Sequence, residues 1–290
     1  MPSENEPREA CLYAAMDSPP ESHDRLLHEL VTPIVSEIRE SADLDSLFFV
    51  RYADPDWQLR FRVLGRPEWV ERCVRPRVEE SIGRFVEAGI IGKVVFGEYA
   101  REWDRYGGPV GMRLAEKIFF HDSVACLEFL EAERQGVCAK PRREYSLAFT
   151  ERFLDLLNFD AGQRAEFYRT GHAWAFRDGV FRDEDRPKLD RRYDAVRDGL
   201  HELRRSLRDG KTTDVLGGNE PRRIAEGCLE ATRPVLDEIV QGNAAGTIHA
   251  SLVDLAWSYT HLHCNRLGID LVPEAILRYL MYRLYEEDPS

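Results

Sequence analysis

A short stretch of the chain brings an acid, an arginine and two glycines close together. Glu102 and Arg105 follow an apolar run and precede Tyr106 and the pair Gly107-Gly108. On a helical turn, Glu102 and Arg105 are i, i+3 neighbours that can form an ion pair. The glycines permit a ligand to approach the backbone closely. Spacing alone is consistent both with a surface ion pair at a helix start and with an arginine held in place to bind an anion.

A second polar cluster ends a helical pattern and contains His261, His263, Asn265 and Arg266. With Cys264 it suggests zinc, but two histidines two residues apart on a helix point about 200° away from each other. No other Cys/His group in the sequence has zinc-ligand spacing, so we expect no metal. Helical spacing instead pairs His261 with Asn265, whose amide can fix the imidazole tautomer, although a capped helix end is the alternative. Arg266 falls on the apolar face of this helix, which predicts a buried partner.

Three arginines lie on a predicted β-hairpin. Arg60 and Arg62 share one face of the alternating strand 59–64, and Arg51 follows the apolar run 47–50 on the partner strand. The planar guanidinium group is suited to binding carboxylates, so the three can form a platform for an acidic ligand. A solvated sheet face with surface arginines is the alternative, because such alternation is usual there. Arg51 is the stronger candidate, since it interrupts an apolar run.

The residues before Gly108 alternate between strand and helix patterns. Hydrophobic spacing predicts a strand at 10–16, a helix at 23–40, hairpin strands at 47–52 and 59–64, a helix from Pro67 and a strand at 90–99. This βαββαβ order is that of the ferredoxin-like fold, in which two helices cover one face of a sheet.

After Gly108 the hydrophobic spacing is helical. The predicted helices lie at 112–130, 145–157, 161–174, 189–207, 222–240, 247–267 and 273–285, with loose connections at 133–143 and 209–220. We therefore expect an α+β protein that is mainly α overall, with a ferredoxin-like sheet-bearing part at 9–108 and a helical part at 109–290. Because the stretch Phe96–Ser123 straddles the join, we expect one domain over 1–290.

Composition excludes several classes of protein. The net charge of −12 argues against broad nucleic-acid binding, because phosphate contacts need a basic surface. The six cysteines include no CxxC pair, which indicates reduced thiols in a cytoplasmic protein. No apolar run approaches the length of a membrane span. A phosphate loop, a Rossmann glycine run and a GxSxG elbow are all absent from the sequence, so we expect no cofactor.

The combined motifs resemble a known family. The segments 48–55, 59–62, 98–108 and 261–266 are together similar to the SpaB C-terminal family, although none is specific alone. That family comprises the glutamate-elimination domain of class I lantibiotic dehydratases and stand-alone proteins of thiopeptide-type bacteriocin biosynthesis. The similarity runs nearly end to end, from Leu12 to Leu284.

The resemblance implies a reaction. In the family, a partner enzyme uses glutamyl-tRNA to esterify serine or threonine side chains of a precursor peptide. The elimination domain then expels glutamate and leaves dehydroalanine or dehydrobutyrine. Such a β-elimination needs a base for the Cα proton and cationic groups for the developing negative charge. The base and the acid are not assigned by the resemblance.

The resemblance also implies the residues that carry this reaction. The expected catalytic residues are Arg51, Glu102, Arg105 and His261, where Glu102 either takes part directly or holds Arg105 in place. The family pattern of a histidine followed four and five residues later by Asn-Arg favours His261 over His263. The expected substrate-binding residues are Arg60, Arg62, Tyr106, His263, Asn265 and Arg266.

Two other functions stay open on the sequence. Stand-alone relatives join two dehydroalanines in a formal [4+2] cycloaddition that builds a pyridine, but they depart from the elimination motif that this chain retains. A non-catalytic scaffold that binds a precursor peptide is the alternative of another class. For elimination, the expected partners are a ribosomally made precursor peptide and a separate glutamyl-tRNA-dependent glutamylation enzyme, with no direct nucleic-acid contact and no membrane.

Overall fold

The computed structural model describes residues 10–53 and 56–288. The chain divides into two compact units, of which the first comprises residues up to Glu102 together with 115–131. The second comprises residues 103–114 and 132–290. Helix α5 (Pro109–Arg134) is continuous and contributes residues to both units. The expectation of one domain over 1–290 stays a prediction.

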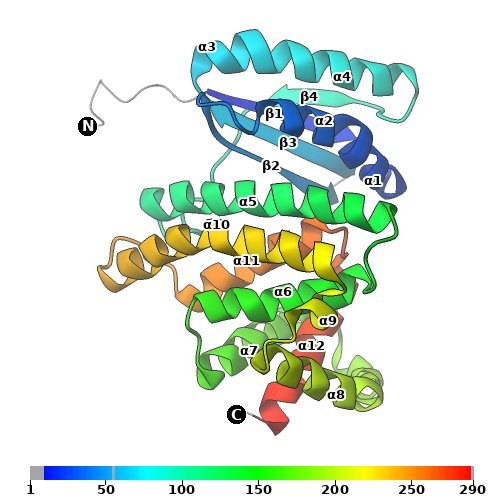
Figure 1. The fold of residues 1–290 in the computed structure, drawn as a ribbon, viewed down its shortest axis with the longest axis vertical. Helices are drawn as coiled ribbons and strands as arrows, with labels where there is room; N and C mark the ends of the chain where they lie inside the picture. The colour runs from blue at the N-terminus through cyan, green and yellow to red at the C-terminus, as the bar shows by residue number, and fades with distance from the viewer. Residues whose placement is uncertain (1–9, 54–55, 289–290) are drawn as a thin grey trace. The chain divides into compact units, whose positions relative to one another are not determined.

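The first unit contains a four-stranded antiparallel sheet. Its strands are β1 (Ala10–Asp17), β2 (Leu44–Ala53), β3 (Trp57–Gly65) and β4 (Val94–Gly97), in the order β2-β3-β1-β4 (Figure 1). This order confirms the ferredoxin-like sheet predicted from the sequence. The last strand is shorter than the predicted segment 90–99, because β4 pairs with only four residues of β1.

Two helical segments connect the strands, and each contains a wide turn. The first comprises η1 (Pro20–Ser22), α1 (His23–Leu26), η2 (Leu27–Val31) and α2 (Thr32–Ile38); the second comprises α3 (Pro67–Trp69), η3 (Val70–Val74) and α4 (Arg75–Glu87). Both η2 and η3 are π-helical turns that end two residues before a proline, Pro33 or Pro76. Proline has no N–H and its ring clashes with the carbonyl four residues earlier, so the regular α pattern is interrupted there.

The two faces of the sheet carry different residues. Leu59 and Phe61 of β3 are fully buried on one face. The strand register pairs Arg51 with Leu59, so Arg51 also lies on this face. On the opposite face, the Phe48 ring packs 5.2 Å from that of Phe119, in the central part of α5. The sheet is therefore covered on both faces within the first unit.

The second unit is helical. It contains the two ends of α5 and α6 (Arg142–Leu156), α7 (Ala161–Arg177), η4 (Asp183–Asp185), α8 (Arg186–Arg208), α9 (Thr212–Leu216), α10 (Asn219–Ala244), α11 (Leu252–Arg266) and α12 (Leu271–Glu287). All seven helices predicted after Gly108 are confirmed. Helix α9 lies inside the stretch 209–220, which was predicted as a loop, because five residues are too few to show helical periodicity.

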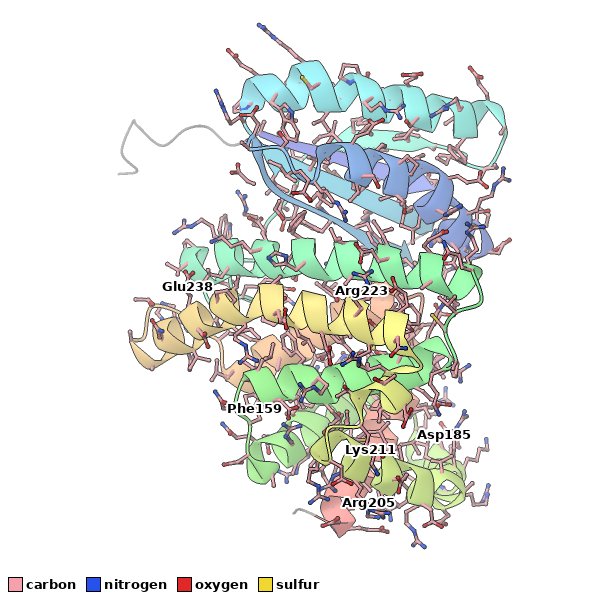
Figure 2. All side chains as sticks on the ribbon, in the orientation of Figure 1. Phe159, Asp185, Arg205, Lys211, Arg223 and Glu238 are labelled. Carbon is pink, nitrogen blue, oxygen red and sulfur yellow. The ribbon has the colours of Figure 1, made fainter. Side chains whose placement is uncertain are left out.

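Helix α10 shows why these segments are helical. Its residues Ile224, Cys228 and Ile239 are buried and recur on one face, while the side chains of Arg223 and Glu238 are exposed (Figure 2). An amphipathic helix of this kind is stabilised by burial of its apolar stripe. Among the described residues, no helix combines the length and the apolar character needed to cross a membrane.

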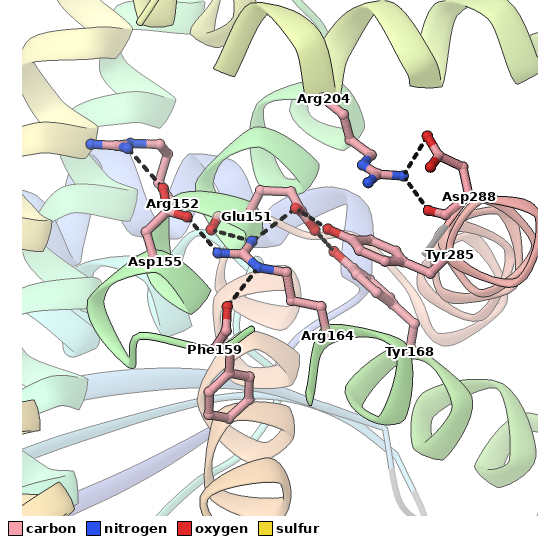
Figure 3. A network of polar contacts seen from close by, with 9 residues as sticks. All are labelled: Glu151, Arg152, Asp155, Phe159, Arg164, Tyr168, Arg204, Tyr285 and Asp288. Carbon is pink, nitrogen blue, oxygen red and sulfur yellow. Dashed lines mark hydrogen bonds and ion pairs between the residues drawn. The ribbon is translucent and has the colours of Figure 1, made fainter. Parts of the chain in front are cut away.

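A buried carboxylate joins three helices of the second unit. Glu151 of α6 is 4% exposed and accepts hydrogen bonds from the hydroxyls of Tyr168 on α7 and Tyr285 on α12, at 2.5 and 2.7 Å (Figure 3). Arg164 Nη1 donates to the same carboxylate at 3.0 Å. Each of these groups would be costly to bury alone, so the network holds α6, α7 and α12 together.

Candidate active site

Arg105 lies in the second unit, on the turn that leads into α5. Its side chain is partly buried, and its Nε donates a hydrogen bond to Ser258 Oγ of α11 at 3.1 Å. The guanidinium carbon also lies 5.7 Å from the centre of the Tyr106 ring and 5.9 Å from that of Trp257. Contacts between a cation and aromatic faces at this distance are attractive. Helix α11 therefore orients Arg105 through a hydroxyl and an indole.

Tyr106 and the glycine pair are occupied by contacts within the chain. The Tyr106 ring is 2% exposed and stacks on Tyr259 of α11, with 5.7 Å between ring centres. Gly107 has φ +76°, and a β-carbon there would lie 2.7 Å from the backbone nitrogen of Ala250. Glycine is therefore needed at Gly107 to let the segment before α11 approach the turn.

His261 lies four residues after Trp257 on α11, and its ring stacks on that indole. The ring centres are 5.2 Å apart and the planes differ by 3°. The imidazole keeps 22% of its side-chain surface exposed. Because Arg105 also contacts Trp257, the structure brings two of the predicted catalytic residues to the same tryptophan. A joint role of Arg105 and His261 in one reaction stays a prediction.

The hydrogen-bond partner of His261 was not predicted from the sequence. His261 Nδ1 lies 2.7 Å from Oε2 of Glu274, a 1%-exposed residue on α12. The other carboxylate oxygen accepts a hydrogen bond from Arg278 Nη2 at 3.0 Å. Burial favours a higher pKa for Glu274, but His261 and Arg278 outweigh it, so the pKa of this carboxyl lies below its usual value. Glu274 is therefore a buried, ionised acceptor for the imidazole.

The remaining residues of the histidine motif are directed elsewhere. His263 is 2% exposed and stacks on Phe149 of α6 with 4.0 Å between ring centres. Arg266 is 1% exposed, which agrees with its place on the apolar face of α11. Asn265 was expected to fix the imidazole of His261, but Glu274 bonds that ring instead. The substrate-binding roles of His263, Asn265 and Arg266 stay predictions.

Arg51 lies in the first unit, with Asp24 and His23 as neighbours. Its side chain is 8% exposed, and Nη2 donates to Asp24 Oδ1 of α1 at 2.6 Å. Next to it, His23 is fully buried and its Nε2 lies 3.2 Å from the carbonyl oxygen of Ser18. Burial, and then the charge of Arg51, lower the pKa of His23 to about 4. Arg51 is thus a fixed cation with a neutral imidazole as a neighbour.

Arg60 and Arg62 lie on the other face of the sheet from Arg51. The guanidinium carbon of Arg60 is 3.3 Å from the centre of the Tyr52 ring. Arg62 is surrounded by Tyr13, Phe48 and Tyr99, at 4.8, 5.2 and 5.1 Å from their ring centres. Burial lowers the pKa of Arg62. The three arginines therefore do not form one platform, because the register turns Arg51 to the opposite side.

The predicted catalytic set is divided between the units. Glu102 is exposed at the end of the first unit, which also contains Arg51. Arg105 and His261 belong to the second unit. The structure groups Arg105 with His261 around Trp257, and a common site for all four catalytic residues stays a prediction.

The family of the chain follows from comparison with known proteins. The model of the family described as "Lantibiotic biosynthesis dehydratase C-term" matches residues 12–285. This chain belongs to that family. Its fold is α+β and mainly helical, as the sequence predicted. The residues that the match covers include every predicted site residue.

Individual known proteins are similar to this chain over different lengths. The subtilin biosynthesis protein SpaB of Bacillus subtilis is 37% identical over 76 residues, which are 26% of this chain and 7% of SpaB. Among solved structures, the tRNA-dependent lantibiotic dehydratase MibB from Microbispora sp. 107891 matches with a TM-score of 0.69 and 20% identity, over 99% of this chain and 28% of MibB. This chain thus spans only a small part of either SpaB or MibB.

Two solved proteins of similar length share the fold. TsrL matches with a TM-score of 0.69 and 20% identity, over 97% of this chain and 95% of TsrL. TbtD, a pyridine synthase from thiomuracin biosynthesis, matches with a TM-score of 0.71 and 14% identity, over 96% of this chain and 98% of TbtD. At these identities the likeness establishes the shared fold and does not decide between reactions.

Proposed function

We propose that this protein eliminates glutamate from glutamylated serine and threonine residues of a ribosomally made precursor peptide, leaving dehydroalanine or dehydrobutyrine. Membership of the lantibiotic dehydratase C-terminal family supports this proposal. The observation that supports it most is that Arg105, a cation, and His261, an imidazole, both contact Trp257, at 5.9 and 5.2 Å from its ring centre. These are the two kinds of group that a β-elimination needs most.

The proposed reaction moves one proton and breaks one C–O bond. His261 takes the Cα proton of the glutamylated residue through Nε2. The electron pair left on Cα forms the Cα=Cβ double bond as the Cβ–O bond breaks, and glutamate departs as a carboxylate. Arg105 stabilises the negative charge on the neighbouring carbonyl and on the leaving group, because a guanidinium stays protonated throughout. Arg51 and Glu102 act in the same reaction, as the resemblance implies.

In this proposal, the protein acts in the cytoplasm as one half of a split dehydratase. MibB, to which this chain is similar, is a tRNA-dependent lantibiotic dehydratase. A separate enzyme then transfers glutamate from glutamyl-tRNA to the precursor peptide, and this protein receives the ester. The net charge of −12 is consistent with a protein that leaves RNA binding to its partner.

The proposal is tested by incubating the protein with a precursor peptide that its own pathway has glutamylated. We expect stepwise loss of glutamate by mass spectrometry. In Arg105→Ala the rate should fall about 10²–10³-fold, as on removal of one oxyanion donor. Arg191→Ala removes an exposed arginine of α8 and should leave the rate unchanged. Equal rates in the wild type and Arg105→Ala would contradict the assignment.

Pyridine formation is the second candidate function, because the chain and TbtD match over nearly their full lengths. It predicts that glutamyl esters stay intact, while a multiply dehydrated peptide is cyclised and its leader released. A binding scaffold predicts peptide affinity with neither product. Mass spectrometry after incubation with a glutamylated peptide and with a multiply dehydrated peptide therefore distinguishes the three functions.

A further inference from the structure

One carboxylate oxygen of Glu274 is committed to His261. The Nδ1–Oε2 distance of 2.7 Å is that of a charge-assisted hydrogen bond. An ionised carboxylate can only accept, so Nδ1 must carry the proton. In a neutral imidazole this leaves Nε2 as the basic nitrogen. Among the described residues, Nε2 makes no hydrogen bond of its own.

The second oxygen of Glu274 is held from another side. Arg278 Nη2 donates to Oε1 at 3.0 Å and to Thr260 Oγ1 at 2.9 Å. Thr260 in turn donates to the carbonyl oxygen of Ala256 at 2.8 Å, within α11. The carboxylate therefore cannot rotate without breaking a bond to Arg278, and its position is tied to the backbone of α11. This arrangement fixes where Oε2 meets the imidazole.

The plane of the imidazole is fixed by Trp257. With 3° between the two planes, the indole covers one face of the ring. Rotation of the imidazole about its bond to the β-carbon would break both this stacking and the bond to Glu274. The two contacts therefore fix the orientation together, and the bond to Glu274 also fixes the tautomer.

The side chains bonded to Glu274 differ in their exposure. Arg278 is 3% exposed and forms an ion pair with the carboxylate. The imidazole of His261 keeps 22% of its side chain exposed, so it is the member of this group that a substrate can reach most readily.

We propose that Glu274, held by Arg278, is a positioning residue for His261 that fixes the Nδ1–H tautomer and presents Nε2 as the basic nitrogen. Its kinetic consequence rests on the proposed elimination, in which Nε2 takes the Cα proton. The aspartate of serine proteases fixes the tautomer of the catalytic histidine in the same way. Its replacement by asparagine gives the wrong tautomer and lowers kcat by about 10⁴-fold.

The test uses Glu274→Gln, which preserves the shape of the side chain and reverses the tautomer. Arg278 can only donate, so it should hold the amide oxygen and turn the amide NH₂ toward Nδ1. Nδ1 must then be unprotonated and Nε2 must carry the proton. Long-range ¹H–¹⁵N spectra of histidine rings distinguish these two states. The His261 signal among the eight histidines is assigned by its loss in His261→Gln.

We expect the Nδ1–H tautomer in the wild type and the Nε2–H tautomer in Glu274→Gln. Glu286→Gln is the control, because it neutralises an exposed carboxylate of the same helix, α12, that does not bond His261. This control should leave the His261 spectrum and the elimination rate unchanged. The kcat of Glu274→Gln should fall by about 10²-fold or more with little change in KM.

An Nε2–H tautomer in the wild type would overturn the inference without any variant, so the test survives poor folding of Glu274→Gln. An unchanged tautomer or an unchanged kcat in folded Glu274→Gln would also overturn it. If the wild type shows the Nδ1–H tautomer but leaves glutamyl esters intact, the elimination fails while the positioning of His261 stands.

Discussion

Arg51 keeps its charge in the interior of the first unit beside a histidine that has lost its own. The guanidinium forms an ion pair with Asp24 at 2.6 Å. His23 is neutral because burial and the nearby cation both disfavour a proton. In the proposed elimination, Arg51 would act as a cation that is already held in place, which is what electrostatic preorganisation requires.

The neutral histidine makes a prediction about stability and pH. The pKa of His23 falls from 6.5 in the unfolded chain to about 4 in the folded protein. Between these values the unfolded chain binds a proton that the folded protein does not, so stability is complete above pH 6.5 and falls as the pH drops toward 4. The full effect is about 3 kcal/mol, of which about 2 kcal/mol is lost between pH 7 and 5.

Urea unfolding of His23→Gln at pH 7 and pH 5 checks this. Glutamine can still donate to the Ser18 carbonyl but cannot take up the proton, so the variant should lose about 2 kcal/mol less than the wild type over this range. His249→Gln, at an exposed position, should keep the wild-type pH dependence. Identical pH dependence of His23→Gln and the wild type would show that His23 is not the group responsible.

At the level of single residues, the sequence indicated candidate residues but not the contacts that support them. Arg105 and His261 stand out by residue type and spacing, and both contact Trp257. Glu274 could not be found in the same way, because its bond to His261 joins two helices and no spacing links them. The expected bond from Asn265 obeyed helical geometry within α11, but a carboxylate from α12 took its place.

At the level of elements, the Glu151 network makes a prediction about stability. In Glu151→Ala the buried hydroxyls of Tyr168 and Tyr285 and the guanidinium of Arg164 lose their shared acceptor (Figure 3). Removing one partner of a buried charged network costs about 3–5 kcal/mol. We expect a loss of this size in the free energy of urea unfolding.

The control for Glu151→Ala lies on the same helix. Glu144 is 52% exposed and pairs with Lys140 at the surface, so Glu144→Ala should cost less than about 1 kcal/mol. Equal losses in the two variants would mean that the Glu151 network does not hold α6, α7 and α12 together.

Hydrophobic periodicity predicted the order and type of the main elements, because the long amphipathic helices and the alternating hairpin bury one side each. Periodicity did not predict features that depend on a short segment, on a capping hydrogen bond or on pairing with another strand. Helix α9 has too few residues for a period, and Ser251 starts α11 later than the spacing suggested by accepting a hydrogen bond from Asp254 N. The face on which Arg51 lies depended on its register with Leu59, which no spacing within one strand reveals.

At the level of the whole molecule, the proposed division of labour makes a prediction about RNA. The protein carries a net charge of −12, so the ester should be recognised through the peptide and not through tRNA. Ribonuclease treatment should leave elimination from a preformed glutamyl peptide unchanged, while unmodified peptide should stay intact until the glutamylating partner and glutamyl-tRNA are added. A loss of elimination after ribonuclease treatment would contradict this division.

The most direct measurement follows a precursor peptide whose ester carries isotopically labelled glutamate. Free labelled glutamate and the residue left behind are quantified from the same sample by mass spectrometry. The proposed elimination predicts one dehydroalanine or dehydrobutyrine for each glutamate released, with both lost together in Arg105→Ala. Release of glutamate with regeneration of serine or threonine, or an ester that survives the wild-type protein, would contradict it.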